Sequence, residues 1–319
     1  MPRIKSGAVL RQDLGQVAYE YALEASLRGL IGLTLLPIFE TPVQTSNYPV
    51  ITKESLLALP DTKRAARSAY GRSDWEFDDG SFACKEFGWE EPVDDTEAAL
   101  YRNFFDAEVV ATQRATSILL RNQEKRIADK LTSTSTFGTH NVSVKWDVPA
   151  TAVPKTDVRD AKQTLLNATG LEANAFICSK TTFDNILMTA QFLEATKYTN
   201  AALLETFEVQ KKLVALFLGV DQVLVGNAIY NGGKKGGTFS ATAIWPDAKG
   251  IVARIATEPQ NLKEACVGRT FLWTEDSPQN LVTEQYREDQ TRSDVYRVRH
   301  NVDECFVFQG AAYLMSGLK

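Results

Sequence analysis

A glycine-rich loop with two lysines is the first stretch whose residue types could do chemistry. Gly232-Gly233-Lys234-Lys235-Gly236-Gly237 combines the small residues and positive charge that phosphate-binding loops use. It lacks the Gly-x4-Gly-Lys-Ser/Thr spacing, because Thr238 follows a glycine and not a lysine. We therefore predict a flexible loop tip after a strand at residues 223–230, and not a nucleotide site.

The residue types that supply nucleophiles and metal ligands are few and scattered. Cys178 lies where a strand should give way to a helix, a position at which a thiolate could be activated, but the apolar Phe176 and Ile177 before it favour a buried structural thiol. His140 and His300 lie in alternating, strand-like segments, and neither has a neighbour at metal-ligand spacing. No Gly-x-Ser-x-Gly motif occurs.

Two groups of carboxylates could in principle do acid–base work. Turns and caps explain them better: Asp78-Asp79-Gly80 has the chemistry of a tight turn, and Asp94 and Asp95 precede a helical pattern. Glu90 and Glu91 lie just before this helix start. We predict no catalytic residue, no cofactor-binding residue and no metal ligand, and we expect that the protein is not an enzyme.

Composition is that of an ordinary folded protein with two or three domains. The chain has 319 residues, of which 44% are hydrophobic and 24% are charged. Its formal net charge of −5 argues against avid nucleic-acid binding as the main activity. Four widely spaced cysteines indicate reduced thiols in a cytoplasmic product. The most apolar run, residues 30–39, is too short to span a membrane.

The elements that must position these residues are organised around one long helical pattern at residues 95–131. Asp94 and Asp95 can cap its start, and no proline or glycine interrupts it. One face carries apolar or small residues at steps of three and four, namely Leu100, Phe104, Ala107, Ala111, Ala115 and Ile118. A single helix of this length would extend about 54 Å at ~1.5 Å per residue. We predict a strut that is packed along one face by a sheet and a loop.

The segments before this helix read as an arm and a loop. A short helix is expected at 13–27, followed by an apolar, proline-punctuated extended stretch at 36–50. This stretch could pack on another subunit or on its own domain, and the sequence favours neither. Residues 48–92 should form two long strands joined by a projecting loop, whose basic part at 63–72 we expect to be mobile.

The segments after the helix predict a strand at 140–148, a linker at Pro149–Pro154 and then a compact α/β unit at 155–270. In this unit we expect a helix capped by Asp157 and closed by Gly170, a helix at 181–189 and a helix at 205–218 that buries Leu216. Buried strands are expected at 175–178, 223–225 and 251–255. The strand-like tail at 271–319 should return to pair with the first half of the chain.

Several short stretches, taken in their order, carry a resemblance to a known family. They are residues 36–42 before Tyr48-Pro49-Val50, then Tyr70-Gly71-Arg72, 82–87, Val93-Asp94-Asp95, 174–187 and 219–226. Over nearly the whole chain this order resembles the major capsid proteins of tailed bacteriophages, which share the Hong Kong 97-type fold with encapsulins. The resemblance implies an α+β fold with an N-terminal arm (1–47), an extended β loop (48–94), a peripheral domain with the spine helix (95–154), an axial α/β domain (155–270) and return strands of the peripheral domain (271–319).

The function that this resemblance implies is a structural one. The chain would self-assemble through pentamers and hexamers into the icosahedral head shell that encloses the DNA of a tailed phage or prophage. Portal, scaffolding and possible decoration proteins would be its partners, with no membrane and no sequence-specific DNA binding. It would assemble in the host bacterial cytoplasm and end in the virion. Some family members crosslink through a lysine; Lys53, Lys63 and Lys85 are possible donors, but no motif selects one.

Two alternatives stay open. An encapsulin-like nanocompartment shell would use the same fold, and the long apolar arm and the length favour the phage. An α/β enzyme would carry its catalytic site in residues 155–270, where the sequence offers no constellation for one.

Overall fold

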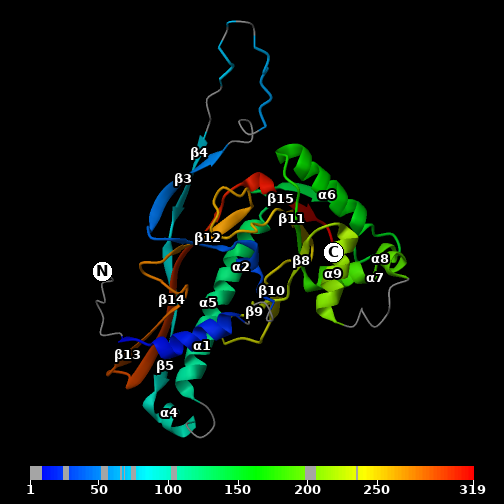
Figure 1. The fold of residues 1–319 in the computed structure, drawn as a ribbon. Coiled ribbons are helices and arrows are strands. Elements are labelled where there is room, and N and C mark those ends of the chain that lie inside the picture. The colour runs from blue at the N-terminus through cyan, green and yellow to red at the C-terminus, as the bar shows by residue number, and fades with distance from the viewer. Residues whose placement is uncertain are drawn as a thin grey trace.

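The computed structural model describes residues 9–23, 29–51, 57–64, 67, 69–72, 77–101, 106–197, 206–234 and 236–319. Two sheets share one long helix, and a narrow hairpin projects from the body (Figure 1). The first sheet is six-stranded and contains β1 (Val9–Leu10), β13 (Val282–Glu288), β14 (Ser293–Phe306), β12 (Gly268–Trp273), β2 (Ile38–Thr41) and β5 (Lys85–Asp94). The second is five-stranded, in the order β6 (Gly138–Asn141), β15 (Ala312–Ser316), β11 (Lys249–Ala253), β7 (Ala175–Ser179) and β8 (Gln222–Gly226).

Helix α5 (Ala107–Leu131) is the element that both sheets share. Its N-terminal half buries Ala111 and Ala115, which pack with Tyr296 and Val298 of β14. Small side chains at these positions let the helix lie close to the sheet. Its C-terminal half buries Ile127, Ala128 and Leu131 in a core that includes alternate residues of β7 and β11 from the second sheet.

The single helix predicted for residues 95–131 is wrong. Helix α4 (Asp95–Tyr101) is separate, and α5 begins anew after Asp106, whose backbone is extended (φ −81°, ψ 110°). The carboxylate of Asp106 accepts a hydrogen bond from the Glu108 backbone N–H at 3.0 Å, so it caps a new helix instead of continuing the old one. Leu100, expected on the packed face, is 65% exposed, and Phe104 lies outside the described residues.

The cap predicted at the start of this region is confirmed. Asp94 Oδ1 accepts from the Thr96 backbone N–H at 2.8 Å, and α4 follows directly.

The projecting hairpin consists of β3 (Thr45–Ile51) paired antiparallel with β4 (Phe77–Ala83). The turn predicted at residues 78–80 is wrong, because these residues lie within β4, where Gly80 pairs with Tyr48. A Cβ on Gly80 would lie 2.4 Å from the Tyr48 ring, so the glycine makes room for an aromatic side chain. The basic stretch at 63–72 is described only in part, and its expected mobility stays a prediction.

The apolar part of the arm belongs to the core of its own subunit. After α1 (Gln12–Leu23) come α2 (Gly32–Leu35) and β2, which pairs parallel with β12. Leu35 and Leu36 are fully buried in the core that also holds Ile127. The Phe39 ring lies 5.4 Å from that of Phe271. Of the two possibilities that the sequence left open, packing on the same chain holds for this stretch.

Helices α6 (Pro154–Thr169), α7 (Lys180–Met188), α8 (Ala190–Thr196) and α9 (Phe207–Leu218) pack on the second sheet, where alternate residues of β7 face them. The expected buried strands are confirmed as β7, β8 and β11. The expected helix stops are confirmed too, since Gly170 and Gly219 both adopt the left-handed conformation. Two further elements, β9 (Ile229–Asn231) and β10 (Ala241–Ala243), form a small hairpin, and the turn η2 (Gln309–Ala311) precedes β15.

Several details of this unit differ from expectation. Asp157 does not cap α6, which starts at Pro154; it is buried and accepts from Trp146 Nε1 at 2.9 Å. The strand expected through residue 148 is shorter, because β6 ends at Asn141. Trp146, which was expected in that strand, is instead fully buried outside it. Leu216 is 80% exposed. The tail returns to the first half of the chain as expected, since β12, β13, β14 and β15 pair with β2, β1, β5 and β6. What was not expected is that β15 also pairs with β11 and so lies in the second sheet.

The contact between α5 and the first sheet gives a stability prediction. Ala115 is fully buried. Replacing it with Trp should lower the free energy of unfolding by about 1–3 kcal/mol or more through overpacking. Thermal or denaturant unfolding measures this, with Asn122→Trp on the exposed face of α5 as the matched control. Equal stability of the Ala115→Trp variant and the wild type would contradict this packing.

Candidate assembly surfaces

The residues that could have done chemistry do not come together. Cys178 is buried in β7, and burial raises the pKa of its thiol, the opposite of an activated thiolate. The glycine-rich loop connects β9 to β10, and Asn231 Oδ1 accepts from the backbone N–H groups of Gly233 and Ser240 at 3.0 Å. Within the described ranges, no group of three His, Cys, Asp or Glu side chains could hold a metal ion. Nor is any helix there both long and apolar enough to cross a membrane.

The two carboxylate groups have separate structural roles. Asp78 and Asp79 are exposed strand residues of the projecting hairpin. Asp95 forms a bidentate pair with Arg287 at 2.6 Å, and this hydrogen bonding lowers the pKa of Asp95. Glu90 and Glu91 lie on β5 and not in a turn. Asp78 and Asp79 both border a hollow of about 640 Å³, whereas Glu90 and Asp95 are each held by an arginine.

Two polar clusters instead hold distant segments of the chain together, and the first is a buried carboxylate on α5. Glu124 Oε1 accepts from the Ile31 backbone N–H at 2.9 Å and from Trp245 Nε1 at 2.6 Å, and Oε2 accepts from the Gly32 backbone N–H at 2.7 Å. Burial raises the pKa of Glu124, and the three donors partly oppose this effect. One side chain thus ties together the arm, the shared helix and the segment after β10.

Two glycines make this junction possible. A Cβ on Gly32 would lie 2.6 Å from Glu124 Oε2, and a Cβ on Gly226 would lie 2.2 Å from the Trp245 ring. The sequence prediction missed Glu124, although a signal was present. Leu120, Glu124, Ile127 and Ala128 follow the spacing of one helical face, so the carboxylate lies within an apolar stripe.

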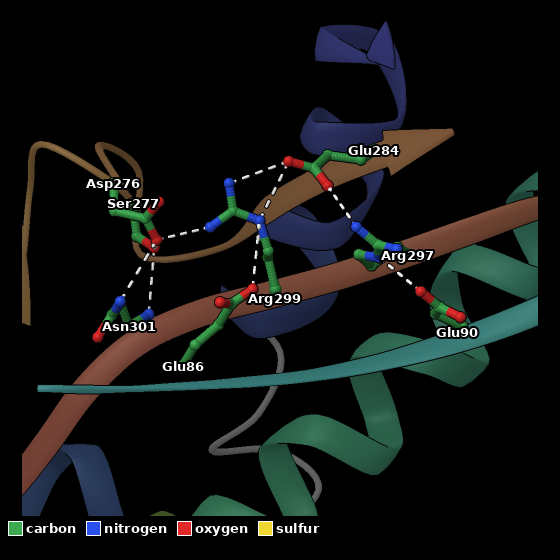
Figure 2. A network of polar contacts seen from close by, with 8 residues as sticks. All are labelled: Glu86, Glu90, Asp276, Ser277, Glu284, Arg297, Arg299 and Asn301. Carbon is green, nitrogen blue, oxygen red and sulfur yellow. Dashed lines mark hydrogen bonds and ion pairs between the residues drawn. The ribbon is translucent and has the colours of Figure 1, made fainter. Parts of the chain in front are cut away.

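The second cluster is a charged network on the face of the first sheet that points away from α5 (Figure 2). Arg299 contacts Glu284 Oε1 at 2.9 Å and Asp276 Oδ2 at 2.6 Å, and it lies 3.9 Å from Glu86. Arg297 bridges Glu90 at 2.6 Å and Glu284 at 3.3 Å. These pairs join β5, β14 and β13 and neutralise both arginines within one subunit.

This network borders a hollow of about 660 Å³ whose lining includes Trp89, 45% exposed. The hollow is therefore a rigid polar surface with one exposed aromatic side chain. Aromatic side chains of this kind are enriched at protein–protein contacts.

Two buried polar side chains, His300 on β14 and Gln123 on α5, have hydrogen-bonding atoms without a partner among the described residues. His300 is fully buried, and its ring lies 6.0 Å from Phe87, edge to face. Among the described residues, neither ring nitrogen of His300 and neither amide atom of the buried Gln123 has a hydrogen-bond partner. Burial, with a smaller contribution from the charge of Arg126, lowers the pKa of His300 to about 3.

The segment that joins β3 to β4 exposes two apolar side chains among its described residues. Leu59 is 98% exposed and Tyr70 is 71% exposed, and the Arg64 guanidinium lies 4.8 Å from the centre of the Tyr70 ring. Lys63 and Arg67 add positive charge to the same segment. A thin hairpin cannot bury these side chains by itself, so they are available to a second molecule.

Comparison with known proteins gives the class of this fold. No protein-family model and no curated protein matches the sequence. Among solved structures, a phage-related protein of Bordetella bronchiseptica RB50 matches with a TM-score of 0.70 and 18% identity, over 98% of this chain and 99% of that one. The capsid of the cyanophage P-SCSP1u matches with a TM-score of 0.57 and 8% identity, over 88% of this chain and 86% of that one.

A virus-like particle from Pyrococcus furiosus also matches, with a TM-score of 0.56 and 13% identity, over 96% of this chain and 98% of that one. The chain therefore has the Hong Kong 97-type fold of phage capsid proteins, as the order of its parts predicted.

The Glu124 junction predicts a specific cost for an isosteric change. Glu124→Gln places an NH₂ group among three N–H donors, so it should lower the free energy of unfolding by about 1–3 kcal/mol. Chemical denaturation measures this, with the exposed Glu97→Gln as the control. If both variants unfold like the wild type, the junction does not hold the three segments together.

His300 predicts a pH dependence. Its pKa in the folded state, about 3, is lower than the ordinary value of 6.5, so below pH 6.5 the unfolded chain binds the proton more readily. The contribution of this group to stability is complete above pH 6.5 and declines towards pH 3, by at most about 1.4 kcal/mol per pH unit. Unfolding midpoints measured at pH 7 and pH 5 should differ less for His300→Leu than for the wild type. An identical pH response of the two proteins would show that His300 is not buried in its neutral form.

Proposed function

We propose that this chain is a major capsid protein, which self-assembles into the icosahedral head shell of a tailed phage or prophage. The observation that carries the proposal is the projecting hairpin with exposed Leu59 and Tyr70, on a body that has the capsid fold from end to end. Such a hairpin gains stability only when a neighbouring copy covers it. The shell function explains both the exposed hairpin and the lack of a catalytic constellation among the described residues.

Each part of the chain has its own proposed role in the shell. Residues 1–47 form the arm, 48–94 the extended loop that reaches over a neighbour, and 95–154 with 271–319 the peripheral domain. The last strand of the loop region, β5, lies in the first sheet beside β14 and so supports assigning it to the peripheral domain. Residues 155–270 form the axial domain, with the loop at 232–237 as a candidate tip near the symmetry axes. The positions of β15 and β6 in the second sheet support moving both strands to the axial domain.

The proposed partners are other copies of this chain in pentamers and hexamers, together with portal and scaffolding proteins and possible decoration proteins. The shell would form in the host cytoplasm, enclose double-stranded DNA and remain in the virion. The protein would not act as an enzyme.

A second candidate is the shell of an encapsulin-like compartment, because a virus-like particle also has this fold and a shell with this fold need not be a phage head. The contents of purified particles separate the two: packaged DNA supports the phage shell, and a cargo protein supports the compartment.

The hairpin provides the test of assembly. Replacing residues 63–72 with a short Gly-Ser linker should abolish closed particles and leave soluble, folded subunits, because the inter-subunit contact is lost. Negative-stain electron microscopy and sedimentation velocity measure particle formation, and circular dichroism checks folding. Normal particles from this variant would contradict the role of the loop, and a wild-type chain that never forms particles would contradict the shell function.

A further inference from the structure

Another hollow lies between α1 and α5, and its charged lining residues are arginines without neighbouring carboxylates in the lining, unlike those of the hollow beside Trp89. It has a volume of about 440 Å³, and its lining includes Arg114, Ser117 and Arg121. These residues are spaced i, i+3 and i+7, so they lie on one face of α5. Gln113 adds an amide donor, and none of the described residues that line the hollow is a carboxylate.

The two arginines here are not neutralised in the way that Arg297 and Arg299 are. Arg114 is 68% exposed, and its ion pair with Glu91 is long at 3.8 Å. Arg121 is exposed and makes no ion pair with any residue that the structure describes. In a chain with a formal net charge of −5, this pair of available guanidinium groups forms a local cationic site.

Positive charge continues beyond the hollow along the same helix. Lys125 follows Arg121 by one turn, although Asp129 pairs with it, and its ammonium group lies 5.9 Å from the centre of the Tyr230 ring in β9. The loop with Lys234 begins directly after β9. From Arg114 to Lys125 the helix rises about 16 Å, which matches several phosphates at about 3.4 Å per nucleotide of one strand.

We propose that the hollow lined by Arg114, Ser117 and Arg121 binds the phosphate backbone of duplex nucleic acid without reading its sequence. Guanidinium groups, a hydroxyl and an amide are the side chains that contact phosphate and sugar in such complexes. The extended track of charge favours a polyanion with regularly repeated charges over a single anion. The inference rests on the proposed function, because it gives the shell a face that contacts the enclosed DNA.

The test uses the full-length chain and a short random-sequence DNA duplex. Fluorescence anisotropy gives the affinity at several salt concentrations, and each lost phosphate contact should reduce the slope of log affinity against log salt by about 0.9. The double variant Arg114→Gln, Arg121→Gln should therefore lose about 1.8 from this slope and bind more weakly at low salt. Ser117→Glu, which puts a carboxylate into the hollow, should also weaken binding.

The matched control is Lys155→Gln, Arg159→Gln, which removes the same charge from exposed positions on α6. Equal losses in the two double variants would overturn the proposal, since general electrostatics would then explain them. Failure of the wild type to bind duplex at low salt would also overturn it, as would binding of polyglutamate but not DNA. Particle formation is imaged in the same preparations, so a failed shell function is distinguished from a failed DNA contact.

Discussion

The carboxylate of Glu124 is the interaction on which the arrangement of the parts depends. It lies in the interior, where a charge is costly, and it is tolerated because three N–H donors from two distant segments converge on it. Losing the Gly32 donor would leave the buried Oε2 without a partner, and losing Ile31 or Trp245 would leave Oε1 with a single donor. The arm, the shared helix and the segment that holds Trp245 are therefore fixed relative to one another.

Helix α5 transmits this constraint to both sheets. Small residues bring its first half close to β14, and large aliphatic residues bury its second half against the other sheet. Gln123, near the middle of the helix, and His300 on β14 are buried with side-chain polar atoms that have no hydrogen-bond partner among the described residues. The two ends of the helix are thus packed against apolar cores, whereas its middle lies near buried polar atoms without hydrogen bonds.

Sequence patterns predicted the elements that depend on local chemistry. The glycine stops at Gly170 and Gly219 and the Asp94 cap were found because each requires only its own neighbourhood. The errors arose where tertiary contacts decide. Asp106 could cap or continue a helix, Gly80 could make a turn or admit a tyrosine, and Asp157 could cap a helix or bind a buried indole. Neither hollow was predicted, because each is formed by segments that lie far apart in the chain.

The position of β15 has a consequence for how the protein is made. This strand lies between β6 and β11 in the second sheet, yet the ribosome synthesises it after both. Until residue 316 has emerged, β6 lacks its one partner strand in that sheet and β11 is paired on one side only. A nascent chain therefore cannot complete the body from which the hairpin projects. The order of synthesis therefore delays completion of the second sheet until translation has passed this strand.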